Sequence, residues 1–104
     1  MSRRRVVVTG MGMLSPIGTT MAESWQNALA GVSGAAPIES FDTTDYTVKF
    51  SSSVKAFDAT LYMDKKEARR SDPFIQYGMA AGVQAIQDAG LSPMPAEGDR
   101  FGVA

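Results

Sequence analysis

The feature that most constrains this sequence is a predicted helix, from residue 73 to about residue 89, that is apolar around most of its circumference. Pro73 suits a first helical position, and Gly90 is placed to end the helix, with Leu91 positioned to contact Ile86. The apolar residues are Phe74, Ile75, Tyr77, Met79, Ala80, Ala81, Val83, Ala85, Ile86 and Ala89. Such a helix must be buried on most sides, whereas a free-standing domain of this size buries only about two-thirds of its unfolded surface. We therefore expect this helix to pack against neighbours that these residues alone do not supply.

Glycines and prolines add two expectations about the same helix. Gly78 and Gly82 lie four residues apart, which predicts the close approach of another backbone. Pro93 and Pro95 are expected to prevent the helix from continuing.

The earlier segments of the chain predict strands and one helix. Val6-Val7-Val8 is typical of a strand covered on both faces, and residues 48–54 alternate as a strand with one solvated face does. Thr20 and Glu23 have the capping-box spacing for an amphipathic helix of about three turns, with Gly31 as its stop.

Three further segments complete the pattern. Residues 33–46 are rich in small and polar side chains and predict a loop. Asp64 can cap a short helix that runs through Arg70, and residues 100–104 resemble the start of a strand. The order strand, helix, strand, helix, strand predicts an α/β architecture.

Charge and composition exclude several classes of function. Ten basic and eleven acidic side chains give a formal net charge of −1, which excludes broad electrostatic binding of nucleic acid. No apolar run approaches the roughly 20 residues of a membrane-spanning helix. The sequence contains neither Cys nor His, so it lacks a thiolate nucleophile, a soft metal site and the commonest general base. With no secretion signal after Arg3-Arg4-Arg5, we expect a cytoplasmic protein.

The glycine-rich turn at Gly10-Met11-Gly12 begins like a dinucleotide-binding motif. The third glycine of that motif is Ser15 here, and Glu39, near the distance of the motif's ribose-binding acid, has no predicted strand before it. The mismatch favours a glycine-bearing bend between a buried strand and a turn over a nucleotide site.

A basic cluster on the short helix 64–70 is the one surface feature that could form a site. With Lys65 taken as zero, Arg69 falls at about 40° and Lys66 at about 100° around the helix axis. Arg70 falls at about 140°, while Glu67 lies beyond the edge at about 200°. A charged face of this kind is usually only solvated; alternatively it docks an acidic protein, whose encounter and register the charges would steer. Composition leaves both interpretations open.

Six stretches of the sequence form an ordered set that is more specific than any one of them. They are Arg4 to Pro16 (RRVVVTGMGMLSP), Trp25 to Gly34, Phe41-Asp42-Thr43, Lys49-Phe50, Lys66-Glu67-Ala68-Arg69 and Asp72 to Gly90. In this order they resemble the N-terminus of the β-ketoacyl-acyl carrier protein synthases, in particular the type II condensing enzymes of bacterial fatty acid synthesis. The resemblance covers essentially the whole chain.

That resemblance implies a thiolase-like α/β fold, with layered α-β-α-β-α architecture and two similar halves in a homodimer, of which this chain is part of the N-terminal half. It also implies elongation of acyl chains by decarboxylative Claisen condensation. In the family, a cysteine accepts the acyl group from acyl carrier protein, and two histidines assist decarboxylation of the malonyl thioester. No metal or redox cofactor is required.

The family's Cys and His are absent from this chain. We therefore expect residues 1–104 to be the N-terminal part of the synthase domain, to stop before its catalytic region and to be inactive alone, and we assign no catalytic residue. The family's carrier-docking helix matches the basic helix, and the implied docking residues are Lys65, Lys66, Arg69 and Arg70. Two alternatives remain: a synthase-like subunit of a polyketide pathway, and a stand-alone module that binds an acidic partner through the helix 64–70.

Overall fold

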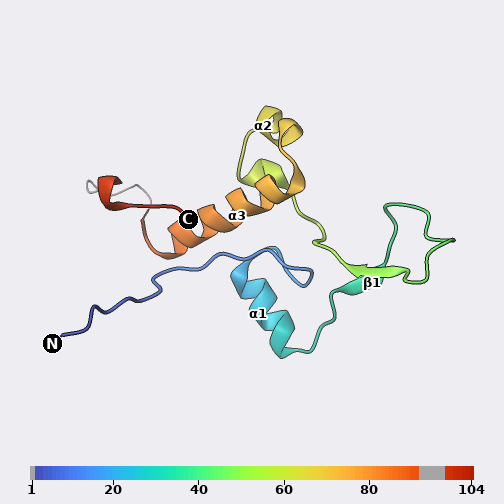
Figure 1. Ribbon diagram of the computed structural model, residues 1–104, viewed down its shortest axis with the longest axis horizontal. Helices are drawn as coiled ribbons and strands as arrows, with labels where there is room; N and C mark the ends of the chain where they lie inside the picture. Colours follow the sequence, from blue (N-terminus) through green and yellow to red (C-terminus); the bar gives the residue numbers. More distant parts are fainter. Residues whose placement is uncertain (1, 92–97) are drawn as a thin grey trace.

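The computed structural model describes residues 2–91 and 98–104, so Pro93 and Pro95 lie outside the described residues. Its elements are α1 (Met21–Leu29), β1 (Ala35–Pro37), β2 (Phe50–Ser52), the 3₁₀ turn η1 (Ala59–Leu61), α2 (Lys65–Arg70), α3 (Pro73–Asp88) and the 3₁₀ turn η2 (Gly98–Arg100). In Figure 1, α3 lies at the centre with α2 at one end, the N-terminal segment runs along α3, and the pair of strands projects away from the helices.

The long helix forms as the sequence predicts. Pro73 stands in its first turn, and the two glycines expected to end α1 and α3, Gly31 and Gly90, have φ angles of +71° and +70°. After α3 the Leu91 N–H donates to the Ile86 carbonyl at 3.0 Å. This backbone bond closes the helix at the residue pair that the sequence singles out.

The helix α1 is capped as expected, with one difference. The Thr20 hydroxyl accepts from the Glu23 N–H at 3.2 Å, but the Glu23 carboxylate accepts from the N–H of Thr19 at 3.2 Å, one residue before the predicted partner. Its apolar stripe is not buried, because Trp25 is 58% and Leu29 is 70% exposed within this chain.

The two strands pair antiparallel, with Ala35 opposite Ser52 and Pro37 opposite Phe50. The strand predicted within residues 48–54 is thus confirmed in its central part, whereas the loop predicted for 33–46 is wrong where β1 forms. Pro37 lacks an N–H donor, which a strand tolerates only where that side needs no partner. Composition marked this segment as a loop because small residues and proline disfavour strands, and a partner strand overrides that preference.

Two predicted strands do not form among the described residues. Val6, Val7 and Val8 are 87%, 69% and 79% exposed and belong to no strand, and residues 101–104 are irregular after η2. β-branched side chains favour an extended backbone, but a strand also needs a neighbour to bond its N–H and C=O groups. The described chain supplies these two segments with no such neighbour.

The glycine-rich segment packs tightly against α3. A Cβ built on Gly10 would lie 2.5 Å from the carbonyl oxygen of Ala85, and one built on Gly12 would overlap with the carbonyl oxygen of Ala81. Side chains at these two positions would therefore push the segment off the helix. By contrast, apart from the backbone of α3 itself and the adjacent residues, no atom lies within 4 Å of a Cβ built on Gly78 or Gly82, so the backbone contact predicted there is absent from the described part of the chain.

Two side chains of α3 bind the backbone of this segment. Asp88 Oδ2 accepts from the Met11 N–H at 2.9 Å, and Gln84 Oε1 accepts from the Met13 N–H at 3.1 Å. Two residues of extended chain advance about 6.6 Å, while four helical residues advance about 6.0 Å. The two spacings nearly match, so alternate backbone donors meet side chains one helical turn apart.

Lys55 joins three segments near the strands. Its ammonium donates to the carbonyl oxygens of Pro16, Gly34 and Ser53 at 3.2, 2.7 and 3.0 Å. A lysine ammonium has three hydrogens, and each has one acceptor here. Lys55 therefore crosslinks these three segments.

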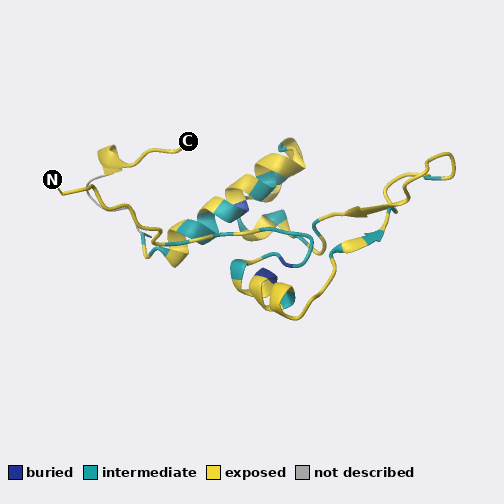
Figure 2. Ribbon diagram, turned by 60° about the horizontal axis from the view of Figure 1, so that its bottom comes forward, coloured by how far each residue is buried: buried dark blue, intermediate teal, exposed yellow. Residues whose placement is uncertain are grey.

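Most residues of the described chain are exposed or intermediate, as Figure 2 shows, and many large apolar side chains are among the exposed ones. Its accessible surface is 8648 Å², against about 5,700 Å² for a compact monomer of this mass. Its radius of gyration is 17.6 Å, against about 13 Å for a compact chain of this length. Among the described residues Ala80 is the one fully buried apolar residue, and Phe74 of α3 is 72% exposed. The expectation that α3 lacks covering neighbours within these residues is confirmed.

Candidate functional site

The basic helix forms as predicted. Asp64 precedes α2, and its Oδ1 accepts from the Glu67 N–H at 2.8 Å. A helix of six residues gains few hydrogen bonds for the cost of its nucleus. Its cap and its contacts with the rest of the chain therefore matter more than they do in a long helix.

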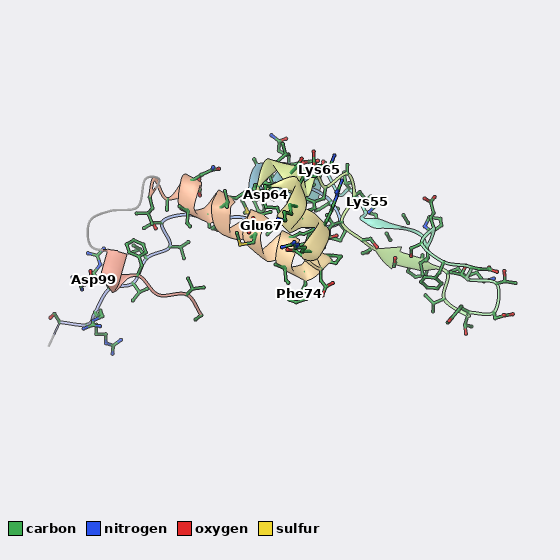
Figure 3. All side chains as sticks on the ribbon, turned by 90° about the horizontal axis from the view of Figure 1, so that it is seen from above. Lys55, Asp64, Lys65, Glu67, Phe74 and Asp99 are labelled. Carbon is green, nitrogen blue, oxygen red and sulfur yellow. The ribbon has the colours of Figure 1, made fainter. Side chains whose placement is uncertain are left out.

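The four basic side chains face away from the molecule. Ala68 of α2 is half-buried, whereas the predicted docking residues, Lys65, Lys66, Arg69 and Arg70, are all exposed. At 100° per residue, Ala68 lies on the side of the helix opposite the basic group. Figure 3 shows Asp64, Lys65 and Glu67 together at α2. The structure thus brings all four predicted site residues onto one exposed side of one helix.

A 3₁₀ turn leads into α2. Asp58 caps this turn, since its Oδ1 accepts from the Thr60 N–H at 3.0 Å and from the Thr60 hydroxyl at 2.6 Å. Both bonds lower the pKa of the Asp58 carboxyl below its ordinary value, because they stabilise its charged form. The bond from the Thr60 hydroxyl has the larger effect, and the bond from the Thr60 N–H the smaller. The carboxylate therefore holds the turn in its charged state.

An aromatic cluster seats this turn on α3. The ring of Phe57 stacks on Tyr62, with centroids 6.1 Å apart, and meets the ring of Tyr77 edge-on at 5.2 Å. The Gln84 amide donates to the Tyr62 hydroxyl at 2.9 Å and to the Thr19 carbonyl at 2.8 Å. The segment that precedes α2 is thereby held against α3 by the packing of aromatic rings and by a hydrogen bond.

A second glutamine of α3 ties the other end of α2. The Gln76 amide donates to the carbonyl oxygens of Ala68 and Ser71 at 2.8 and 3.2 Å. Sequence reasoning assigned no role to Gln76 or Gln84. The signal was present, because a polar side chain on a helix that is apolar nearly all round must find hydrogen-bond partners.

The glycine-rich turn has no nucleotide-binding arrangement. The segment with Gly10 and Gly12 packs along α3, and the chain then turns at Ser15–Gly18 before α1 begins. A short strand, β1, does precede Glu39, contrary to the expectation, but within residues 2–91 and 98–104 its one partner strand is β2. Gly10 and Gly12 therefore allow the segment to pack closely on α3. The predicted bend after a buried strand is wrong, because the described residues before it form no strand.

Other kinds of site find little support in the described residues. In residues 2–91 and 98–104 no three acidic side chains come together as metal ligands would. Across the same residues, none of the helices has both the length and the apolar character that a bilayer crossing requires. The exposed side of α2 is thus the candidate that the geometry favours.

Comparison with known proteins identifies a family and several relatives that the chain resembles. Residues 3–104 match the family described as beta-ketoacyl synthase, N-terminal domain. The chain is 57% identical over 104 residues to 3-oxoacyl-[acyl-carrier-protein] synthase 2 of Vibrio cholerae and 43% identical over 103 residues to the protein of that name in Synechocystis. In each case it covers 25% of the relative, so the chain spans about a quarter of the length of the curated relatives it matches.

A solved structure shares the arrangement of the elements. The ishigamide ketosynthase/chain length factor superposes with a TM-score of 0.78 at 38% identity, over 86% of this chain and 22% of that one. The predicted fold class, α/β and thiolase-like, is confirmed for the part of the fold that this chain represents.

Proposed function

Because the chain belongs to the β-ketoacyl synthase family, we propose that it forms the N-terminal part of a 3-oxoacyl-[acyl-carrier-protein] synthase of fatty acid synthesis. The observation that carries this proposal is the 57% sequence identity, over all 104 residues, with the Vibrio cholerae protein of that name. The whole protein transfers an acyl group from a cysteine thioester to the carbanion that malonyl-carrier forms as it loses CO₂; the new C–C bond forms as the C–S bond breaks, and the cysteine leaves as a thiolate. Residues 1–104 contain no Cys and no His, so in this proposal the family's cysteine nucleophile and its two histidines are supplied by other parts of the synthase domain.

The part of the function that these residues perform is recognition of acyl carrier protein. The carrier is a small acidic protein, and α2 presents Lys65, Lys66, Arg69 and Arg70 on one exposed side. Charges at the rim of an interface steer the encounter and set the register of the two partners. The acyl and malonyl thioesters arrive on this carrier, so the docking surface controls their delivery.

Several wider properties belong to the same proposal. The whole protein is a cytoplasmic homodimer, and its condensation proceeds without a metal or redox cofactor. The exposed apolar faces of α3 and the unpaired valines at residues 6–8 support the view that further parts of the domain cover them.

A polyketide-pathway subunit is the second candidate, because one solved structure that the chain resembles is a ketosynthase/chain length factor. The residue at the nucleophile position of the whole protein distinguishes a catalytic from a non-catalytic subunit. A stand-alone binding module is less favoured, since the described chain has a single fully buried apolar residue and no core of its own.

Reversal of charge in the full-length protein tests the docking surface. Arg69→Glu with Arg70→Glu should raise KM for acyl groups on the carrier by about tenfold or more, since two attractions become repulsions. The KM for small pantetheine thioesters should stay unchanged. The difference in carrier KM between the variant and the parent protein should shrink at high salt, because salt screens the charges. Arg3→Glu with Arg4→Glu, a matched reversal in the N-terminal segment, is the control. Equal loss on both substrates would show that α2 serves folding and not docking.

A further inference from the structure

The strongest unassigned feature is the contact between Gln76 and the end of the basic helix. Gln76 stands one turn into α3 and is half-buried. Its amide nitrogen donates to the Ala68 carbonyl at 2.8 Å and to the Ser71 carbonyl at 3.2 Å. An amide NH₂ has two hydrogens, so both donors are used. Only the nitrogen side of the amide can face two carbonyl oxygens, which makes this orientation unambiguous.

The two carbonyls that Gln76 binds lie at the end of α2. The last four carbonyls of a helix have no partner within the helix, and Ala68 carries one of them. Ala68 and Ser71 immediately flank Arg69 and Arg70 in the sequence. One side chain of the long helix therefore holds the backbone on both sides of the two arginines.

The basic helix has little else to hold its end. It contains six residues, and a helix this short is marginal without outside contacts. Asp64 caps its first turn, and the cluster of Phe57, Tyr62 and Tyr77 seats the segment before it. Ser71 has an extended backbone at the corner between α2 and α3, so the Gln76 amide sets how the last turn of α2 lies against α3.

We propose that Gln76 is a positioning residue for carrier recognition: its amide fixes the corner between α2 and α3 and so sets the direction in which Arg69 and Arg70 face the acidic partner. This inference rests on the docking function proposed for α2. In this proposal the half-buried, uncharged Gln76 contributes to carrier docking by positioning the exposed arginines that contact the carrier.

The test uses the full-length protein and the variant Gln76→Met, which keeps the length of the side chain and removes both donors. KM for acyl groups on the carrier should rise by about three- to tenfold, the range that one or two lost hydrogen bonds produce. The kcat, and the KM for pantetheine thioesters, should stay unchanged. Gln87→Met is the matched control, because Gln87 is a glutamine of the same helix whose side chain makes no hydrogen bond to α2 among the described residues, and it should leave the KM ratio between carrier and pantetheine substrates unchanged.

A double-mutant cycle connects the glutamine to the arginines. If Gln76 acts through them, Arg69→Ala should cost less in the Gln76→Met background than in the parent protein, so the two effects are not additive. Hydrogen exchange supplies a readout besides activity: the amides of α2 should exchange faster in Gln76→Met, while those in the middle of α3 keep their rates. Gln76→Asn, one methylene shorter, should move both measurements in the same direction and serves if Gln76→Met does not fold.

The outcomes separate the two proposals. If the reversal at Arg69 and Arg70 raises KM for the carrier substrate but Gln76→Met does not, the positioning role is wrong and docking stands. Equal loss on carrier and pantetheine substrates in Gln76→Met, or strict additivity with Arg69→Ala, also overturns the positioning role. If the arginine reversal itself has no effect, docking is wrong and the role of Gln76 falls with it.

Discussion

Gly10 and Gly12 show what single residues decide in this chain. Their φ angles are not in the left-handed region, so neither is required by the backbone conformation. Each is required by space, because α3 passes where a side chain would stand. The sequence motif is therefore a packing device, although its spacing resembles the start of a nucleotide-binding turn.

A methyl group at residue 12 should be destabilising. In the full-length protein, Gly12→Ala places a Cβ against the Ala81 carbonyl, and strain of this kind costs about 1–3 kcal/mol. Denaturant unfolding followed by circular dichroism measures the loss. Met11→Leu is the neighbouring control, since Met11 is 51% exposed and its replacement conserves volume. A Gly12→Ala protein as stable as the parent would refute the close packing on α3.

At the scale of elements, the caps of α2 and α3 form a natural comparison. Asp64 and Asp72 both precede a helix with an extended backbone, but Asp64 accepts a hydrogen bond from the helix while the Asp72 side chain makes no capping bond. Pro73 occupies the first turn of α3, where its missing N–H costs nothing. The short helix thus depends on its cap and the long helix does not.

Asp64→Ala should weaken α2 by about 0.5–2 kcal/mol, the usual value of an N-cap bond. Asp72→Ala should weaken α3 much less. Native-state hydrogen exchange of the amides in each helix measures the two effects separately in the full-length protein. A larger loss in α3 than in α2 would contradict the assignment of the caps.

The candidate site could be predicted at this scale because it is local. The four basic residues and the Asp64 cap lie within seven consecutive residues, and helical geometry alone puts the charges on one side. The contacts that hold the site were not predictable in this way. Gln76 and Tyr62 belong to different elements, and their partners follow from how those elements pack.

The whole molecule is open because its apolar residues meet few others. With a radius of gyration of 17.6 Å and one fully buried apolar side chain, the described chain has no core comparable to that of a compact domain. Family membership explains this, since the chain spans about a quarter of its relatives' length.

The isolated 104-residue chain should therefore melt broadly and bind a dye specific for apolar surface. Calorimetry measures the cooperativity of melting and dye fluorescence measures the exposed apolar surface. Small-angle scattering measures the radius of gyration, which should exceed the value of about 13 Å for a compact chain of this length. The full-length protein should melt cooperatively and bind little dye. A sharp calorimetric transition of the isolated chain, together with a radius near 13 Å, would contradict the open arrangement.

What the sequence by itself determined are the helices, their caps and the basic side of α2, because each depends on bonds and periods that span a few residues. The tertiary structure alone decided the pairing of β1 with β2, the packing of Gly10 and Gly12 on α3, and the bonds of Lys55. The segment that holds Gly10 and Gly12 also bonds α3 through Met11 and Asp88, which are 77 residues apart in the sequence. A local pattern states that a residue prefers to be buried or extended; which neighbour satisfies that preference depends on the path of the whole chain.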